Sequence, residues 1–213
     1  MTQETMNIHR ALVELKTLES RILKEIRNGT YVVPNKHSNA KIGGISIADF
    51  CEDVKAHYQK VRDLIKRREA IKRAVVLSNA TTKVVINGKE YTVAEAIEMK
   101  NHGISELQTL MSMMATQYNE ATRKADRENS DLLDRRADEF IRSTYGATDL
   151  KNMGEEIKQK RNEFIAEQTV ELVDPIGVKA QVEELEKYIS GFLVEVDSVL
   201  STSNATTEIE VNY

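Results

Sequence analysis

The 213-residue chain contains no tryptophan, one cysteine and two prolines. The single cysteine, Cys51, excludes an internal disulfide framework and fits a reducing compartment. No apolar run approaches the ~18 residues that a membrane-spanning helix needs. We therefore expect a cytoplasmic protein that does not enter a membrane.

Aromatic residues are also scarce, at 5% of the chain, whereas 40% of the residues are hydrophobic and 30% are charged. This composition is typical of amphipathic helices whose seams are filled by aliphatic side chains. Apolar residues recur at spacings of three and four through residues 2–28, 46–77, 93–125 and 174–201. The pattern predicts a mainly α protein, a long-helix antiparallel bundle or coiled coil. Its narrow seams also predict a homo-oligomer, because such a stripe needs a partner helix.

Local signals place helix starts and a few strands. Asn87-Gly88 favours a type I′ turn between strands 83–86 and 89–92, and Thr92 with Glu95 forms the capping box of the next helix. Ser46 is expected to cap the second helix, and Asp174-Pro175 to begin the last. Together with segments 169–173 and 207–211, the hairpin is predicted to form one small antiparallel sheet at one end of the bundle.

The seam pattern weakens between residues 126 and 168, where charged residues dominate and residues 145–148 indicate a break. We interpret 126–168 as a helical insertion within a single domain that covers residues 1–213.

A ten-residue pattern occurs twice. Residues 78–87 (SNATTKVVIN) return as residues 203–212 (SNATTEIEVN), each after a helical stretch. An asparagine just after a helix tolerates left-handed geometry, and a threonine pair suits the start of a strand. The repeat therefore predicts two corners at which a helix ends and a strand begins.

These motifs resemble a known family. The segment 6–12 (MNIHRAL), the Ser-Asn-Ala-Thr-Thr corners, residues 87–97 (NGKEYTVAEAI) and Val173-Asp174-Pro175 are similar to the septicolysin-like helical proteins. The nearest likeness is to members encoded by phages of Gram-positive bacteria. The resemblance implies a long-helix bundle with a small sheet, and it implies no activity. It would place the protein in the host cytoplasm.

No catalytic pattern stands out. The four histidines are dispersed, and no Cys or His spacing fits a metal site. Gly43-Gly44 matches no phosphate-loop template, and no nucleophile elbow is present. We expect a protein that is not an enzyme and that uses no cofactor.

Charge is distributed unevenly although the net charge is only -4. Residues 55–73 carry eight basic and two acidic side chains, whereas residues 150–213 carry six basic and thirteen acidic ones. The basic helix either pairs with the acidic last helix or faces an anion. Nucleic acid is the less favoured anion, because the patch is local and no reader motif accompanies it. Arg68 interrupts the apolar seam and needs a partner.

If the basic helix faces an anion, arginine forks and nearby amide and hydroxyl groups would form a pocket for a small phosphate-bearing ligand. The residues that we predict to bind it are Arg67, Arg68, Lys72, Asn79, Thr81, Thr82, Asn204, Thr206 and Thr207. The functional hypothesis is a phage-type anti-defence protein that sequesters a nucleotide signal of the host. The alternative is a coiled-coil scaffold or assembly protein that acts through protein–protein contacts.

Overall fold

The computed structural model describes residues 3–146 and 154–213. The protein is mainly α, with long helices and small antiparallel strand pairs, as the sequence predicts. Its contacts divide the chain into two compact units, Met1–His102 with Gly191–Tyr213, and Gly103–Ser190. Among the described residues, no helix combines the length and apolarity needed to cross a membrane.

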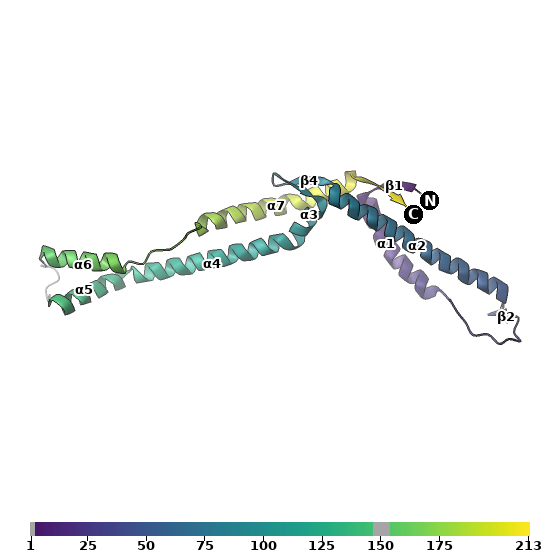
Figure 1. The fold of residues 1–213 in the computed structure, drawn as a ribbon, viewed down its shortest axis with the longest axis horizontal. Coiled ribbons are helices and arrows are strands. Elements are labelled where there is room, and N and C mark those ends of the chain that lie inside the picture. The colour runs from purple at the N-terminus through teal and green to yellow at the C-terminus, as the bar shows by residue number, and fades with distance from the viewer. Residues whose placement is uncertain (1–2, 147–153) are drawn as a thin grey trace. The chain divides into compact units, whose positions relative to one another are not determined.

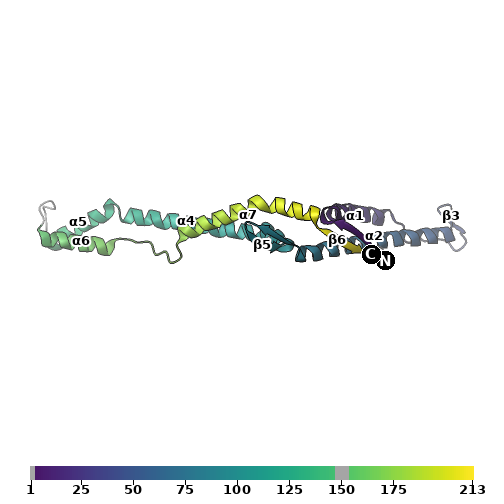
Figure 2. The ribbon, with the colours of Figure 1, turned by 90° about the horizontal axis from the view of Figure 1, so that it is seen from above.

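Two antiparallel helices dominate the first unit. Helix α1 (Ile8–Asn28) lies along α2 (Ile47–Thr81) in both ribbon views (Figures 1 and 2). The loop between them contains the two-residue strands β2 (Lys41–Ile42) and β3 (Ile45–Ser46). The Ser46 hydroxyl accepts the Asp49 N–H at 3.1 Å, which confirms the predicted cap of α2.

A strand pair packs on these helices. Strand β6 (Glu208–Asn212) pairs antiparallel with β1 (Gln3–Asn7). The prediction that the first helix begins at residue 2 was therefore wrong, because residues 3–7 form β1 and Asn7 caps α1. The strand pair and both helices share one buried core, which contains Met6, Ile8, Leu18, Ile22, Ile71, Val75, Ile209 and Val211.

The predicted hairpin is confirmed. Strand β4 (Lys83–Ile86) pairs with β5 (Lys89–Thr92) across Asn87 and Gly88, whose φ angles are 50° and 73°. The Thr92–Glu95 capping box opens α3 (Val93–Glu98), and a π-helical turn η1 (Met99–Gly103) follows. A single sheet was predicted, but the described residues form three separate two-stranded sheets.

The second unit contains α4 (Ile104–Glu128), α5 (Asp131–Tyr145) and α6 (Glu155–Gln168). Helices α5 and α6 lie side by side, with the rings of Phe140 and Phe164 stacked at 4.6 Å (Figures 1 and 2). The predicted break is confirmed at Gly146, which ends α5 at φ 63°, whereas positions 147 and 148 lie outside the described residues.

The segment before the last helix α7 (Val178–Thr206) differs from the prediction in two respects. Residues 169–173 form no strand; instead, the Asn129 side chain exchanges two hydrogen bonds of 2.8 Å with the backbone of Val170. Asp174 does accept the first helical N–H, but that N–H belongs to Val178, so Pro175 precedes the helix.

Candidate functional site: a charged groove beside the repeated corners

The two copies of the repeat form matching corners. In each copy the helix continues through Ser-Asn-Ala-Thr, so α2 ends at Thr81 and α7 at Thr206. Asn79 and Asn204 are therefore helical, and the predicted left-handed geometry at these asparagines was wrong. The strand begins one residue beyond the second threonine of each copy.

Hydrogen bonds at the corners are equivalent. The N–H of Thr82 donates to the Ser78 carbonyl at 2.8 Å, and the N–H of Thr207 donates to the Ser203 carbonyl at 2.9 Å. The carbonyls of Thr82 and Thr207 accept the first N–H of α3 and α1, at 2.9 and 3.0 Å respectively.

The remaining threonines of the repeat also bind locally. The hydroxyls of Thr81 and Thr206 donate to carbonyls one turn earlier in their own helices, at 3.1 and 2.9 Å. Local hydrogen bonds of the repeated residues thus account for the shape of both corners without a bound ligand.

The likeness extends beyond the repeat. The strand that enters α1 matches the strand that enters α3, and each corner buries the same set of positions. The matched buried pairs are Met6 with Tyr91, Ile8 with Val93, Ala11 with Ala96, Ile209 with Val84, and Val211 with Ile86. The first unit therefore contains two versions of one strand–helix corner.

The Arg67 side chain is held by partners within the protein. Its guanidinium donates to Glu4 at 2.9 Å, to both carboxylate oxygens of Glu14, and to the hydroxyl of Tyr213. It also lies 4.7 Å from the centre of the Tyr213 ring. The two carboxylates, Glu14 first, raise the pKa of Arg67. This network ties α2 to α1, β1 and the end of β6.

Arg68 and Lys72 lie four residues apart on another face of α2. Arg68 is half-buried and Lys72 is exposed. At ~100° per residue they project to the side opposite Lys66 and Ala70. Neither side chain forms an ion pair or hydrogen bond within the described parts of the chain.

The expected pairing of this basic helix with the acidic last helix is not found among residues 3–146 and 154–213. The ion pairs of α2 reach Glu4, Glu14 and Glu25, on β1 and α1. The acidic residue of α7 that forms an ion pair is Asp197, and its partner is Lys100, 2.5 Å away in η1.

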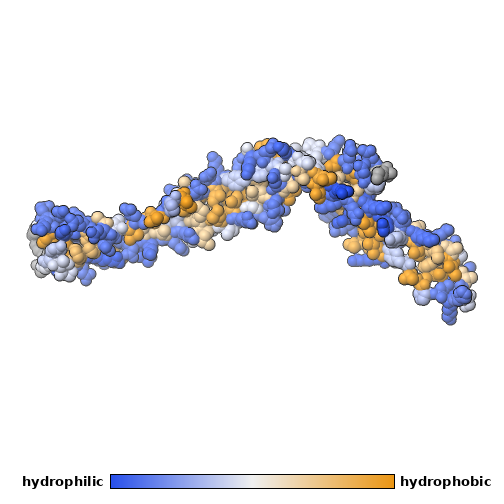
Figure 3. Space-filling view, viewed as in Figure 1, coloured by the Kyte–Doolittle hydropathy of each residue, from blue (hydrophilic) through white to orange (hydrophobic). Residues whose placement is uncertain are grey.

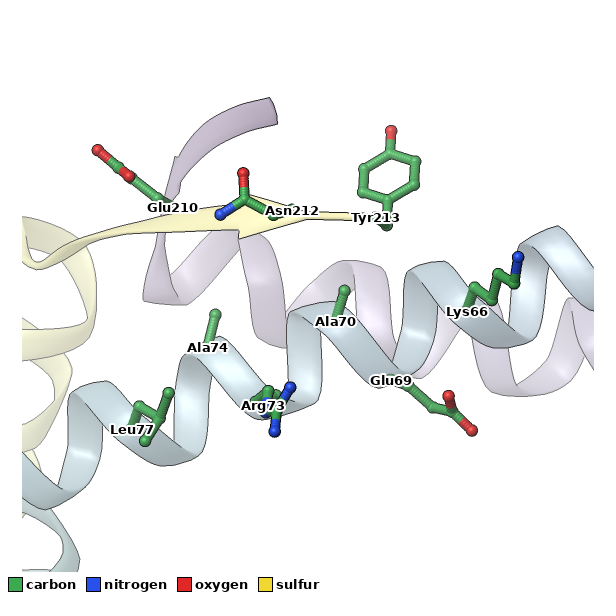
Figure 4. Close-up of a pocket in the computed structure, with 9 residues that line it drawn as sticks. All are labelled: Lys66, Glu69, Ala70, Arg73, Ala74, Leu77, Glu210, Asn212 and Tyr213. Atoms are coloured by element: carbon green, nitrogen blue, oxygen red, sulfur yellow. The ribbon is translucent and has the colours of Figure 1, made fainter. Parts of the chain in front are cut away.

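A groove forms where β6 crosses α2. Its volume is about 600 Å³, and Figure 4 shows the lining residues. They are Lys66, Glu69, Ala70, Arg73, Ala74 and Leu77 of α2, and Glu210, Asn212 and Tyr213 at the end of the chain described here. None of the nine residues predicted to bind a ligand lines this groove, so their predicted role remains untested.

The groove combines small side chains with two basic and two acidic ones. Ala70 and Ala74 point from α2 toward β6, whereas Glu69 points away from the strand (Figure 4). Lys66 and Arg73, on either side of Ala70, form no ion pair with any described residue. The sequence shows both cations, but it does not show that β6 runs over this stretch of α2 (Figure 4).

A second groove, of about 450 Å³, lies within the other unit between α4 and segment 170–178. Its lining is mainly apolar and includes Val173, which is 95% exposed. No cluster of three or more His, Cys, Asp or Glu side chains in the described residues has the geometry of a metal site.

Comparison with known proteins reveals no matching family model, curated protein or solved structure. The resemblance to septicolysin-like proteins therefore stays a prediction.

Proposed function

We propose that the protein acts by binding, and that the α2–β6 groove holds a small phosphate-bearing ligand of the nucleotide type. The observation that carries this proposal is the pair of cations, Lys66 and Arg73, which line an open groove and form no ion pair with any described residue, although Glu69 and Glu210 also line it. Unpaired cations that line a cavity are typical of anion sites. Lys60 and Arg67 of α2, by contrast, pair with carboxylates of the protein itself.

The size and chemistry of the groove fit such a ligand. About 600 Å³ lies within the usual range of ~300–1,000 Å³ for small-molecule sites. Lys66 and Arg73 are seven positions apart in α2, which is ~10 Å along the helix axis. An arginine fork can hold two phosphate oxygens, and a lysine adds a point charge. The Asn212 carboxamide offers both a donor and an acceptor to a base.

A binding protein of this kind would act stoichiometrically. In the host-defence setting suggested by the phage-type resemblance, it would sequester a nucleotide signal and convert nothing. The sequence predicted that Arg67 binds the ligand, but its guanidinium already binds Glu4 and Glu14. We therefore assign the ligand to Lys66 and Arg73 instead.

Calorimetric titration with cyclic dinucleotides and ADP-ribose derivatives tests the proposal. We expect one of these ligands to bind the wild-type chain, and Lys66→Ala and Arg73→Ala each to weaken binding about tenfold or more. Lys72→Ala is the matched control, because it removes the same charge from the opposite face of the same helix. No binding across the panel, or equal losses in all three variants, would contradict the proposal.

The second candidate function is assembly through protein contacts. It is favoured by large apolar side chains that remain exposed on the helices, among them Val13, Leu23, Val76, Leu77, Met113 and Val194. Hydrophobic patches also interrupt the surface visible in Figure 3. Exposed apolar area of this kind is typical of interfaces. Sedimentation analysis and a pull-down would distinguish the candidates, since a scaffold retains a protein and a sequestering protein retains a small ultraviolet-absorbing molecule.

A further inference from the structure

The two corners differ in what meets the free edge of their strands. In an antiparallel pair, alternate residues direct their backbone groups toward the partner strand. The bond from the Ile8 N–H to the Thr207 carbonyl, with the register of β1 and β6, assigns Ile209 and Val211 to the β1 side. The backbone groups of Glu210 and Asn212 therefore point to the open edge above α2.

At the first corner the equivalent position is occupied by the protein itself. Asn87 corresponds to Asn212 in the repeat, and its backbone N–H donates to the Glu195 carboxylate at 2.6 Å. Glu195 comes from α7, which contacts the hairpin there through Phe192 against Tyr91, and α2 contacts β6 at the second corner. A carboxylate thus satisfies the outward N–H at the first corner.

At the second corner no carboxylate stands at the position of Glu195. The groove gains two cations there, together with Glu69 and Glu210, which the repeat matches with Val194 and Val85. The spacing of the repeat, from Ser78 to Ser203, matches Glu195 with Ala70. The same spacing matches Gly191 with Lys66, and Ser198 with Arg73. The Asn212 N–H has no hydrogen-bond partner among the described residues. Figure 4 shows Asn212 over the part of α2 that contains Ala70 and Ala74.

We propose that the backbone N–H of Asn212, with Lys66 and Arg73, forms an anion subsite that takes a ligand phosphate where Glu195 places its carboxylate in the other corner. This subsite rests on the proposed function and specifies it. The ligand's phosphate oxygen accepts the N–H, and Ala70 leaves the room for it. The two flanking cations favour an anionic phosphate group, whose several oxygens can accept from both side chains and from the N–H.

Restoring the missing carboxylate tests the subsite. Ala70→Glu introduces an internal acceptor that competes for the Asn212 N–H and repels a phosphate. We expect the affinity for ADP, used as the probe in calorimetric titration, to fall at least tenfold. Ala70→Gln is the control for size: it adds a side chain of similar length without the charge, and it is expected to lower affinity much less. Glu195→Ala should create no second site, because Gly191 and Ser198 carry no charge there.

A measurement on the wild-type protein complements the variants. In a nitrogen-15 amide spectrum, ADP should shift the Asn212 resonance downfield, and adenosine, which lacks phosphate, should not. Unaltered affinity in Ala70→Glu, or an Asn212 resonance that ADP leaves in place, would overturn the subsite while the losses in Lys66→Ala and Arg73→Ala keep the proposed function. Equal losses in Ala70→Glu and Ala70→Gln would show simple blockage and also overturn it. A wild-type protein that binds none of the phosphate-bearing ligands would remove both proposals.

Discussion

The Arg67 network allows a quantitative test of what holds the second corner together. Replacing Arg67 by Met removes the charge but keeps most of the side-chain volume. Glu4 keeps Arg10 as a partner at 3.0 Å, whereas Glu14 loses the only ion pair that the described residues give it. The expected cost therefore comes mainly from a stranded Glu14 carboxylate.

Burial sets the size of that cost. Breaking a fully buried ion pair costs ~3–5 kcal/mol, and an exposed pair contributes ~0–1 kcal/mol. The side chains of Arg67 and Glu14 are 20% and 22% exposed. We therefore expect Arg67→Met to lower the free energy of unfolding by about 2–3 kcal/mol, between these limits.

The other corner predicts how the loss is recovered. Repeat spacing matches Arg67 with Phe192, which is fully buried and contacts Tyr91 edge-on at 5.9 Å. An apolar residue is thus accepted at this position when no carboxylate faces it. Adding Glu14→Met to Arg67→Met should therefore restore most of the stability, because no unpaired charge remains.

Urea unfolding followed by circular dichroism measures these effects. The slope of the free energy of unfolding against urea concentration should be the same in all variants, which checks that each unfolds in the same transition. The double variant should be more stable than either the Arg67→Met or the Glu14→Met single variant. Additive losses in the double-mutant cycle would refute the assignment of the cost to the stranded carboxylate.

Three further predictions concern other parts of the chain. Helix propensity alone predicts that Gly191→Ala raises the free energy of unfolding by ~1 kcal/mol. We expect no such gain, because the new Cβ would lie 2.6 Å from the Asn87 side-chain oxygen. Urea unfolding measures the difference, and a full gain would contradict the prediction. Asn129→Ala should speed amide exchange at Val170, since both of its backbone bonds to Asn129 are lost. The backbone of Thr92 lowers the pKa of Glu95, so the stabilisation by the capping box is present above the unfolded-state pKa and is lost as the pH falls through the lower folded-state value. Glu95→Gln should remove that part of the acid sensitivity in pH-dependent melting, and an unchanged acid limb would count against it.

Local signals in the sequence predicted much of the fold. The Asn-Gly turn, the Thr92 capping box and the helix periodicity depend on neighbouring residues, and all three are confirmed. Strand β1 was missed because its partner β6 lies at the other end of the sequence, so no local pattern indicates the pairing. Segment 169–173 alternates like a strand, but in the described residues no strand pairs with it.

The candidate site depended still more on tertiary structure. The sequence shows the basic residues of α2, but it does not show which groups bind Arg67 or that a groove lies beside Lys66. Ala70 and Ala74 form a groove only because β6 crosses them, and alanines elsewhere on a helix carry no such meaning. The repeat predicted the corners correctly, and its two copies differ where the groove forms.

Binding of a phosphate-bearing nucleotide at the α2–β6 groove is the central claim, and one titration tests it most directly. The wild-type chain and the variants Lys66→Ala, Arg73→Ala and Lys72→Ala should be titrated with the same ligand, the tightest-binding member of the cyclic dinucleotide and ADP-ribose panel. We predict saturable binding to the wild type and to Lys72→Ala, with about tenfold or greater loss in the two groove variants. Binding that is unchanged in both groove variants, or absent from the wild type, would contradict the claim.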